Sequence, residues 1–61
     1  MPHIQIDWFR GRSVEQKREL AEVLTREICR IGQCAPESVG IVFTDVETDN
    51  WSRGGKLFAD D

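Results

Sequence analysis

A single stretch with the period of an α-helix lies between two strand-like stretches, and this order constrains the fold of the 61-residue sequence more than any other feature. The helical stretch carries apolar residues at spacings of three and four, namely Leu20, Ala21, Val23, Leu24, Ile28 and Ile31. Ser13 and Gln16 match a capping box at its start, and Gly32 suits the position just after its end. The sequence therefore predicts a helix from about Val14 to Ile31.

The two flanking stretches have the patterns of β-strands. From His3 to Phe9 the residues alternate, so that Ile4, Ile6 and Trp8 share the face that we expect to contact the helix. From Val39 to Thr44 most residues are β-branched or aromatic. Because a helix of about 18 residues separates the two stretches, we expect parallel strands with a right-handed crossover.

The last segment, from Asp45 to Asp61, has no sustained period. Turn signals at Asp49-Asn50 and Gly54-Gly55 flank Trp51, so we predict a short hairpin that reaches onto a neighbouring subunit. The predicted fold class is therefore α/β, with one domain over residues 1–61. It consists of a single β-α-β unit with parallel strands and a short C-terminal hairpin.

The short length predicts that this unit assembles with copies of itself. A chain of this size buries only about 60% of its unfolded surface, and a lone β-α-β unit leaves two strand edges open. We expect pairs of units to form four-stranded sheets in an oligomer. Cys29 and Cys34 could form a disulfide, but the absence of a signal peptide or long apolar run favours a reducing cytoplasm and no membrane partner.

Charge and ligand spacing disfavour two further classes of partner. The net charge of −3 argues against a nucleic acid, which requires a basic face. His3 is the only histidine, the two cysteines lack the spacing of a redox or zinc motif, and the acidic loop Asp45 to Asp49 lacks the order of a calcium site. We therefore predict no metal site and no cofactor.

Three short motifs follow one another along the chain. They are Pro2 directly after Met1, the turn Gly11-Arg12-Ser13 followed by Glu15-Gln16-Lys17, and the late segment Trp51-Ser52-Arg53-Gly54-Gly55. Together with the chain length they resemble the 4-oxalocrotonate tautomerase family of the tautomerase superfamily. The resemblance implies a tautomerase that moves a proton in small 2-oxo or 2-hydroxy unsaturated carboxylates. It also implies homo-hexamers, built as trimers of dimers, with sites near the N-termini that neighbouring chains line.

By this resemblance Pro2 is the catalytic residue, acting first as general base and then as acid after removal of Met1. An α-amino group has a reference pKa of about 7.7–8.0, and burial in an apolar site lowers the pKa of an amine. A neutral amine can accept a proton near pH 7. Taken alone, Pro2 would be interpreted as stiffening the start of a strand, and it is the whole-chain resemblance that favours catalysis.

The resemblance also assigns substrate-binding residues. Arg12 matches an arginine that binds a substrate carboxylate, which a guanidinium can hold through two parallel hydrogen bonds. Its alternative is a surface arginine, although the positive end of a helix disfavours a cation there. Trp51 matches a large aromatic residue that walls the site and disfavours the charged amine by desolvation. Packing between subunits is compatible with that role.

Gly40 departs from the family pattern. The best-known members carry a second arginine there, which is thought to polarise the substrate carbonyl and stabilise the dienolate. Loss of one such donor typically costs on the order of 10²–10³ in rate. Arg10 and Arg53 are the candidate replacements within the substrate-binding set, with plain surface charges as the alternative, and His3 could tune Pro2.

Two other functions stay open at this stage. The chain could be a weakly active or non-catalytic subunit of a hetero-oligomer in which a paralogue supplies the missing arginine. It could also add water to an unsaturated acid or dehalogenate it, as relatives with a protonated proline do. No water-activating carboxylate stands at a family-matching position, which ranks this last function lower.

Overall fold

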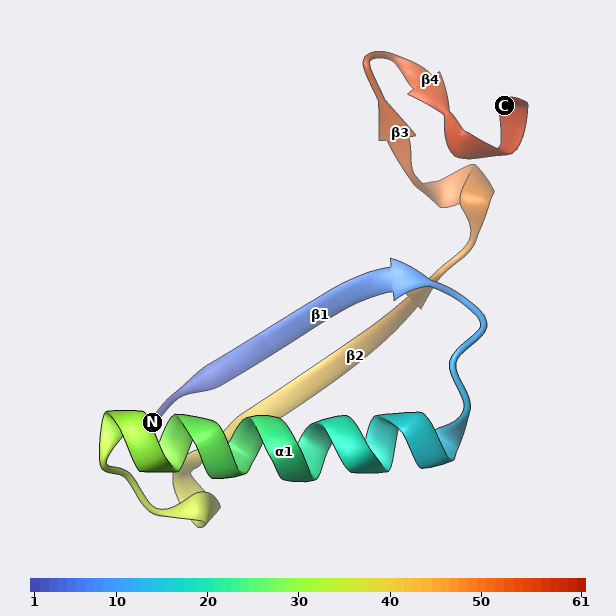
Figure 1. Cartoon of the computed structure of the whole chain (residues 1–61). Coiled ribbons are helices and arrows are strands. Elements are labelled where there is room, and N and C mark those ends of the chain that lie inside the picture. Colours follow the sequence, from blue (N-terminus) through green and yellow to red (C-terminus); the bar gives the residue numbers. More distant parts are fainter.

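The computed structural model describes residues 1–61 as a β-α-β unit followed by a hairpin (Figure 1). Strand β1 (His3–Phe9) leads through helix α1 (Val14–Gly32) to strand β2 (Gly40–Val46), and the hairpin strands are β3 (Ser52–Arg53) and β4 (Lys56–Leu57). β1 and β2 are parallel, with His3 opposite Gly40 and Phe9 opposite Val46. β3 and β4 are antiparallel. The predicted fold class is confirmed.

Helix α1 begins at the predicted residue and ends one residue late. The Gln16 amide donates to Ser13 Oγ at 3.2 Å and the Ser13 amide donates to Gln16 Oε1 at 2.8 Å, which confirms the capping box. The prediction that Gly32 follows the helix is wrong. Gly32 is the last helical residue, and Gln33 takes the left-handed conformation with φ 53°. The left-handed conformation that ends the helix is thus adopted by a residue with a Cβ, for which it is sterically less favourable than for glycine.

The two faces of β1 differ in burial as the alternation predicts. Ile4, Ile6 and Trp8 are partly buried, whereas His3, Gln5 and Asp7 are exposed. The Trp8 ring stacks on Phe43 of β2, with ring centroids 5.5 Å apart and an interplanar angle of 22°. The apolar stripe of α1 is shorter than predicted, because Ile31 is 71% exposed.

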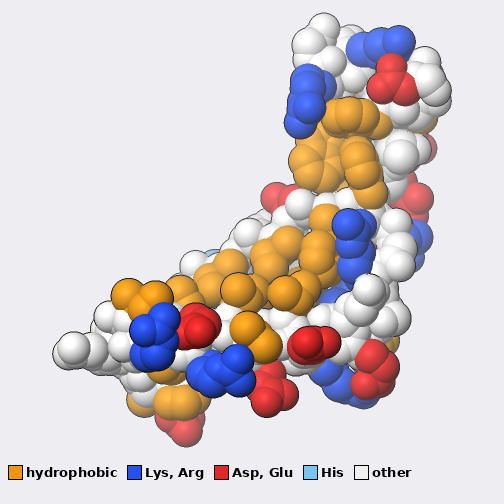
Figure 2. Space-filling view, viewed as in Figure 1, with side chains coloured by type: hydrophobic (Ala, Val, Ile, Leu, Met, Phe, Trp, Pro, Cys, Tyr) orange, Lys and Arg blue, Asp and Glu red, His pale blue; other side chains and the backbone are white.

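The isolated chain has no core of its own. None of its 61 residues is fully buried, and the molecule extends over 43 × 24 × 14 Å. The hairpin projects away from the β-α-β unit (Figure 1). Figure 2 shows hydrophobic side chains at the surface along the unit and at the base of the hairpin. None of the helices is long and apolar enough to span a membrane.

Candidate active site

The predicted site residues lie at opposite ends of β1. Pro2 precedes the strand, whereas Arg10 and Arg12 follow it. β1 has 7 residues, so at about 3.3 Å per residue Pro2 lies roughly 23 Å from Phe9 at the far end of the strand. Pro2 and Arg12 of one chain therefore cannot contact the same small substrate.

At the N-terminal end, Pro2 lies directly beside Gly40. The Gly40 amide donates a hydrogen bond to the carbonyl oxygen of Pro2 at 3.0 Å. A Cβ added to Gly40 would meet His3 Nδ1 at 3.5 Å and Met1 Cε at 3.6 Å, both ordinary contacts. His3 is on the exposed face of β1, so a side chain at position 40 would project on the face opposite the helix.

At the other end of β1, a concave surface of about 360 Å³ collects most of the predicted binding residues. We call it the aromatic hollow, and its lining residues are Asp7, Trp8, Phe9, Arg12, Trp51, Arg53 and Phe58. The ring of Phe9 lies 4.9 Å from that of Trp51 and 5.1 Å from that of Phe58. Three of the four predicted substrate-binding residues, Arg12, Trp51 and Arg53, thus share one surface.

The two guanidinium groups of the aromatic hollow are held against aromatic rings. Arg12 Nη1 donates to the carbonyl oxygen of Phe9 at 3.0 Å, and its guanidinium lies 5.0 Å from the centre of the Trp8 ring. The guanidinium of Arg53 lies 5.4 Å from the centre of the Phe58 ring. Cations over ring faces are attracted by the ring quadrupole, so two positive charges face this hollow.

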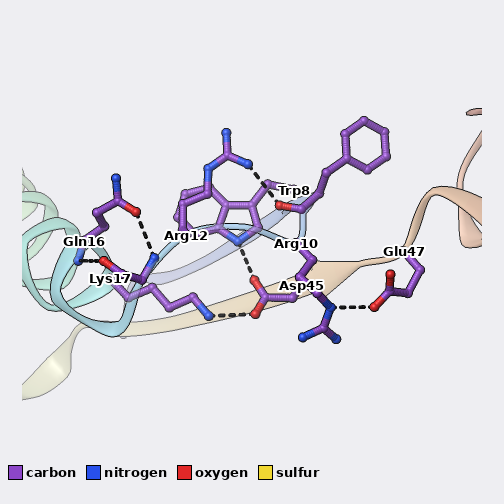
Figure 3. Close-up of polar contacts among 9 residues, drawn as sticks. Trp8, Arg10, Arg12, Gln16, Lys17, Asp45 and Glu47 are labelled. Atoms are coloured by element: carbon purple, nitrogen blue, oxygen red, sulfur yellow. Dashed lines mark hydrogen bonds and ion pairs between the residues drawn. The ribbon is translucent and has the colours of Figure 1, made fainter.

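Arg10, the fourth predicted binding residue, does not line the aromatic hollow. It donates to Glu47 Oε1, and this hydrogen bond together with the charge of Glu47 raises the pKa of Arg10 above its ordinary value (Figure 3). Its charge is thus already neutralised within the chain. Of the two candidate replacements for the missing arginine, Arg53 is the one that joins Arg12.

A polar network beneath Arg12 was not expected from the sequence. Trp8 Nε1 donates to Asp45 Oδ1 at 2.9 Å, and Lys17 Nζ donates to Asp45 Oδ2 at 2.7 Å (Figure 3). The hydrogen bond from Lys17, followed by that from Trp8, lowers the pKa of Asp45. From the sequence, Trp8 was expected only to face the helix and Asp45 only to lie in an acidic loop. The available signal was that a partly buried indole N–H requires an acceptor.

The remaining candidates for chemistry are the cysteines. Cys29 and Cys34 are both free thiols, with their sulfur atoms 3.9 Å apart. Desolvation, together with the neighbouring Cys34, raises the pKa of Cys29. No group of three or more potential metal ligands is present.

Comparison with known proteins gives a consistent result over the whole chain. Residues 2–61 match the family model described as tautomerase enzyme. A probable tautomerase from Streptococcus agalactiae is 37% identical over 57 residues, which cover 93% of this chain and 95% of that protein.

Solved structures agree with the sequence match. The crystal structure of a 4-oxalocrotonate tautomerase homologue superposes with a TM-score of 0.88 and 34% identity, covering 100% of this chain and 97% of that one. A heterohexameric 4-oxalocrotonate tautomerase from Chloroflexus aurantiacus superposes with a TM-score of 0.84 and 30% identity, covering 98% of this chain and 97% of that one.

Proposed function

The chain belongs to the tautomerase family, and we propose that it is a cofactor-independent tautomerase of small unsaturated 2-hydroxy or 2-oxo carboxylates. Pro2, freed by removal of Met1, is the general base and acid. The observation that carries the proposal is the aromatic hollow, where Arg12, Arg53 and Trp51 lie together. Such a surface suits a flat, conjugated anion, because guanidinium groups bind the carboxylate and rings contact the apolar carbons.

We propose that each site is completed between chains. Asp7, the lining residue of the aromatic hollow that is nearest to Pro2 in sequence, is five strand residues or roughly 16 Å away from it, so the base must come from one chain and the hollow from a neighbour. The absence of any buried residue in the single chain supports assembly. We propose a homo-hexamer, a trimer of dimers with four-stranded sheets. Light scattering at micromolar concentration should give a mass several times the 7.0 kDa of the chain, whereas a folded monomer would contradict the proposal.

The proposed reaction needs only groups that the chain supplies. The neutral nitrogen of Pro2 accepts the proton of the 2-hydroxyl group of a dienol, the electron pair moves into the conjugated system, and the resulting prolinium returns the proton to a carbon of the dienolate. Arg12 holds the carboxylate. Arg53 faces the oxygen on which charge develops, where a fixed cation lowers the barrier. Trp51 and its neighbouring rings exclude water, which disfavours the charged amine between turnovers.

Two measurements test this proposal together. Intact-protein mass spectrometry should show loss of Met1, because an amide nitrogen at Pro2 has no basic lone pair. Substitution Pro2→Ala should then lower kcat on a generic dienol acid by at least about tenfold, since general base catalysis typically contributes 10²–10⁴-fold and the new primary amine is a weaker or misplaced base. Arg18→Ala, which removes an exposed helix residue paired with Glu15, is the control. Equal activity in the Pro2 variant would remove Pro2 from the mechanism.

Gly40 favours one alternative, a weakly active or non-catalytic subunit of a hetero-oligomer. The relative from Chloroflexus aurantiacus is a heterohexamer, and a paralogue could supply the arginine that Gly40 lacks. Purification of the chain from its native cell distinguishes the two cases. A stable complex with a second short chain supports the alternative, and strong turnover by the recombinant chain alone removes it.

Asp7 favours the other alternative, a hydratase-like or dehalogenase-like activity. Its carboxylate lines the aromatic hollow with both guanidinium groups and accepts only a hydrogen bond of 3.3 Å from Gln5. A carboxylate in that place could activate a water molecule for addition to an unsaturated acid. Release of halide from a haloacrylate by the parent protein, abolished in Asp7→Asn, would support this function. A parent protein that releases no halide, or release that Asp7→Asn leaves unchanged, would exclude it.

A further inference from the structure

The geometry beneath Arg12 points to a positioning role for Trp8. We infer that Trp8, oriented by Asp45 and Lys17, holds the guanidinium of Arg12 in the conformation that binds the substrate carboxylate. This inference rests on the proposed function of Arg12 as the carboxylate anchor. It adds three positioning residues that do not themselves touch the substrate's reacting atoms.

The Arg12 side chain retains little conformational freedom. One end of its guanidinium is fixed by the bond from Nη1 to the Phe9 carbonyl oxygen at 3.0 Å. The guanidinium also lies over the Trp8 ring, whose centre is 5.0 Å away and whose quadrupole attracts the cation (Figure 3). No acidic side chain pairs with Arg12, so its other N–H groups stay available for a carboxylate. A pre-ordered arginine loses less conformational entropy when it binds.

Two residues of β2 orient the Trp8 ring. Phe43 stacks on the ring with centroids 5.5 Å apart. Asp45 Oδ1 accepts the indole N–H at 2.9 Å, which fixes the rotation of the ring within its plane. Because Trp8 lies opposite Asp45 in the parallel register of β1 and β2, both the stack and the hydrogen bond come from the neighbouring strand.

The negative charge of Asp45 would compete with the substrate for Arg12 if no other group neutralised it. Lys17 Nζ lies 2.7 Å from Asp45 Oδ2, and both side chains are about a quarter exposed, at 25% and 24%. The anion of Asp45 is therefore neutralised by Lys17 at the edge of the indole ring, whereas Arg12 lies over the face of that ring. Arg12 forms no ion pair within the chain, and it lines the aromatic hollow together with Arg53 and the carboxylate of Asp7.

The test compares a carboxylate substrate with its methyl ester, which has no charge for Arg12 to bind. Trp8→Leu removes the ring face, and it should raise KM for the acid about tenfold, the middle of the range expected for a cation over a ring. The kcat for the acid should change much less than its KM, and the kcat/KM for the ester should fall less than the kcat/KM for the acid, because Trp8 also lines the aromatic hollow. Asp45→Asn and Trp8→Phe should give smaller changes in the ratio of kcat/KM for the acid to kcat/KM for the ester, because each variant keeps an aromatic ring next to Arg12.

Each outcome of this test separates the present inference from the proposed function. If Arg12→Ala raises KM for the acid but Trp8→Leu does not, the positioning role is wrong and the anchor stands. If Arg12→Ala leaves KM unchanged, the proposed anchor itself is wrong. If Trp8→Leu lowers kcat/KM equally for the acid and the ester, Trp8 has only a structural role and the inference is overturned. If light scattering shows that Trp8→Leu does not assemble, the test uses Trp8→Phe and Asp45→Asn instead. The ratio of kcat/KM for the acid to kcat/KM for the ester then decides.

Discussion

The amide of Gly40 donates a hydrogen bond to the carbonyl oxygen of Pro2 across 3.0 Å. Residue 40, the first residue of β2, therefore lies directly beside the residue that carries the proposed base. A cation at this position would act on the substrate next to the amine, whereas in the proposed assembly the cations of the aromatic hollow come from another chain. Replacement of the family arginine by glycine thus removes a donor from one side of the proposed site.

Restoring that donor is the first prediction. Gly40→Arg should be tolerated, because the nearest atoms to the new Cβ lie at 3.5 and 3.6 Å and the side chain projects away from the helix. It should raise kcat on a 2-hydroxydienoate by on the order of tenfold or more, and change KM less, since the charge is needed mainly in the transition state. Gly40→Ala is the matched control. Absence of any gain in an intact oligomer would show that the site has diverged beyond this residue.

The second prediction concerns acid stability and Asp45. Its pKa is lowered in the fold by Lys17 and then Trp8, so its contribution to stability is fully present above the ordinary pKa of about 3.9. That contribution is lost as the pH falls through the depressed pKa of the folded state. Asp45→Asn should be less stable than the parent at pH 7, and the difference should shrink below about pH 4. Urea midpoints at fixed chain concentration measure this, and a difference constant with pH would contradict the assignment.

The third prediction concerns the end of α1. Gly32→Ala should raise stability by about 0.5–1 kcal/mol, because Gly32 is helical and a Cβ there meets nothing within 4 Å. Gln33→Gly should stabilise by a similar amount, because Gln33 has φ 53° and a Cβ costs roughly 1–2 kcal/mol in that conformation. Urea midpoints again provide the measurement. Destabilisation by Gly32→Ala would mean that the helix stops before Gly32.

The fourth prediction concerns thiol reactivity. Desolvation and the nearby Cys34 raise the pKa of Cys29, so the thiolate fraction near pH 7.5 is smaller than that of an unstructured thiol. In a Cys34→Ser variant, which isolates Cys29, alkylation by iodoacetamide should be slower than for glutathione at the same pH. Addition of urea should remove the difference. Faster alkylation than glutathione would contradict the assigned environment.

The parts of the fold that depend on neighbours in sequence could be predicted, and those that depend on small energy differences could not. Ser13 and Gln16 fix the start of α1 through two local hydrogen bonds. The end of α1 is a competition between adjacent residues for one left-handed position. Glycine is favoured there, yet continuation of the helix through Gly32 places Gln33 in that conformation.

The site shows the same division. The order of motifs was enough to group Arg12, Trp51 and Arg53, which line the aromatic hollow. The pairing of Trp8 with Asp45 depends on the register between β1 and β2, and this register could not be predicted from the pattern of residues in the two strands. The separation of Pro2 from the far end of β1, where the Arg12 guanidinium lies over Trp8, follows from strand length. The idea that another chain closes the gap came from family resemblance rather than from the residues.

Mixed oligomers test the central proposal, that Pro2 of one chain acts on a substrate bound in the aromatic hollow of another. Chains carrying Pro2→Ala and chains carrying Arg12→Ala, each expected to have a kcat/KM well below that of the parent, are unfolded together in equal amounts, refolded and assayed at a substrate concentration below the parent KM. If the site forms between chains, about a quarter of the sites combine an intact Pro2 with an intact Arg12 in a randomly mixed symmetric oligomer. The proposal predicts recovery of roughly that fraction of parent activity. Failure to recover activity, in oligomers shown by native mass spectrometry to contain both variants, would contradict it.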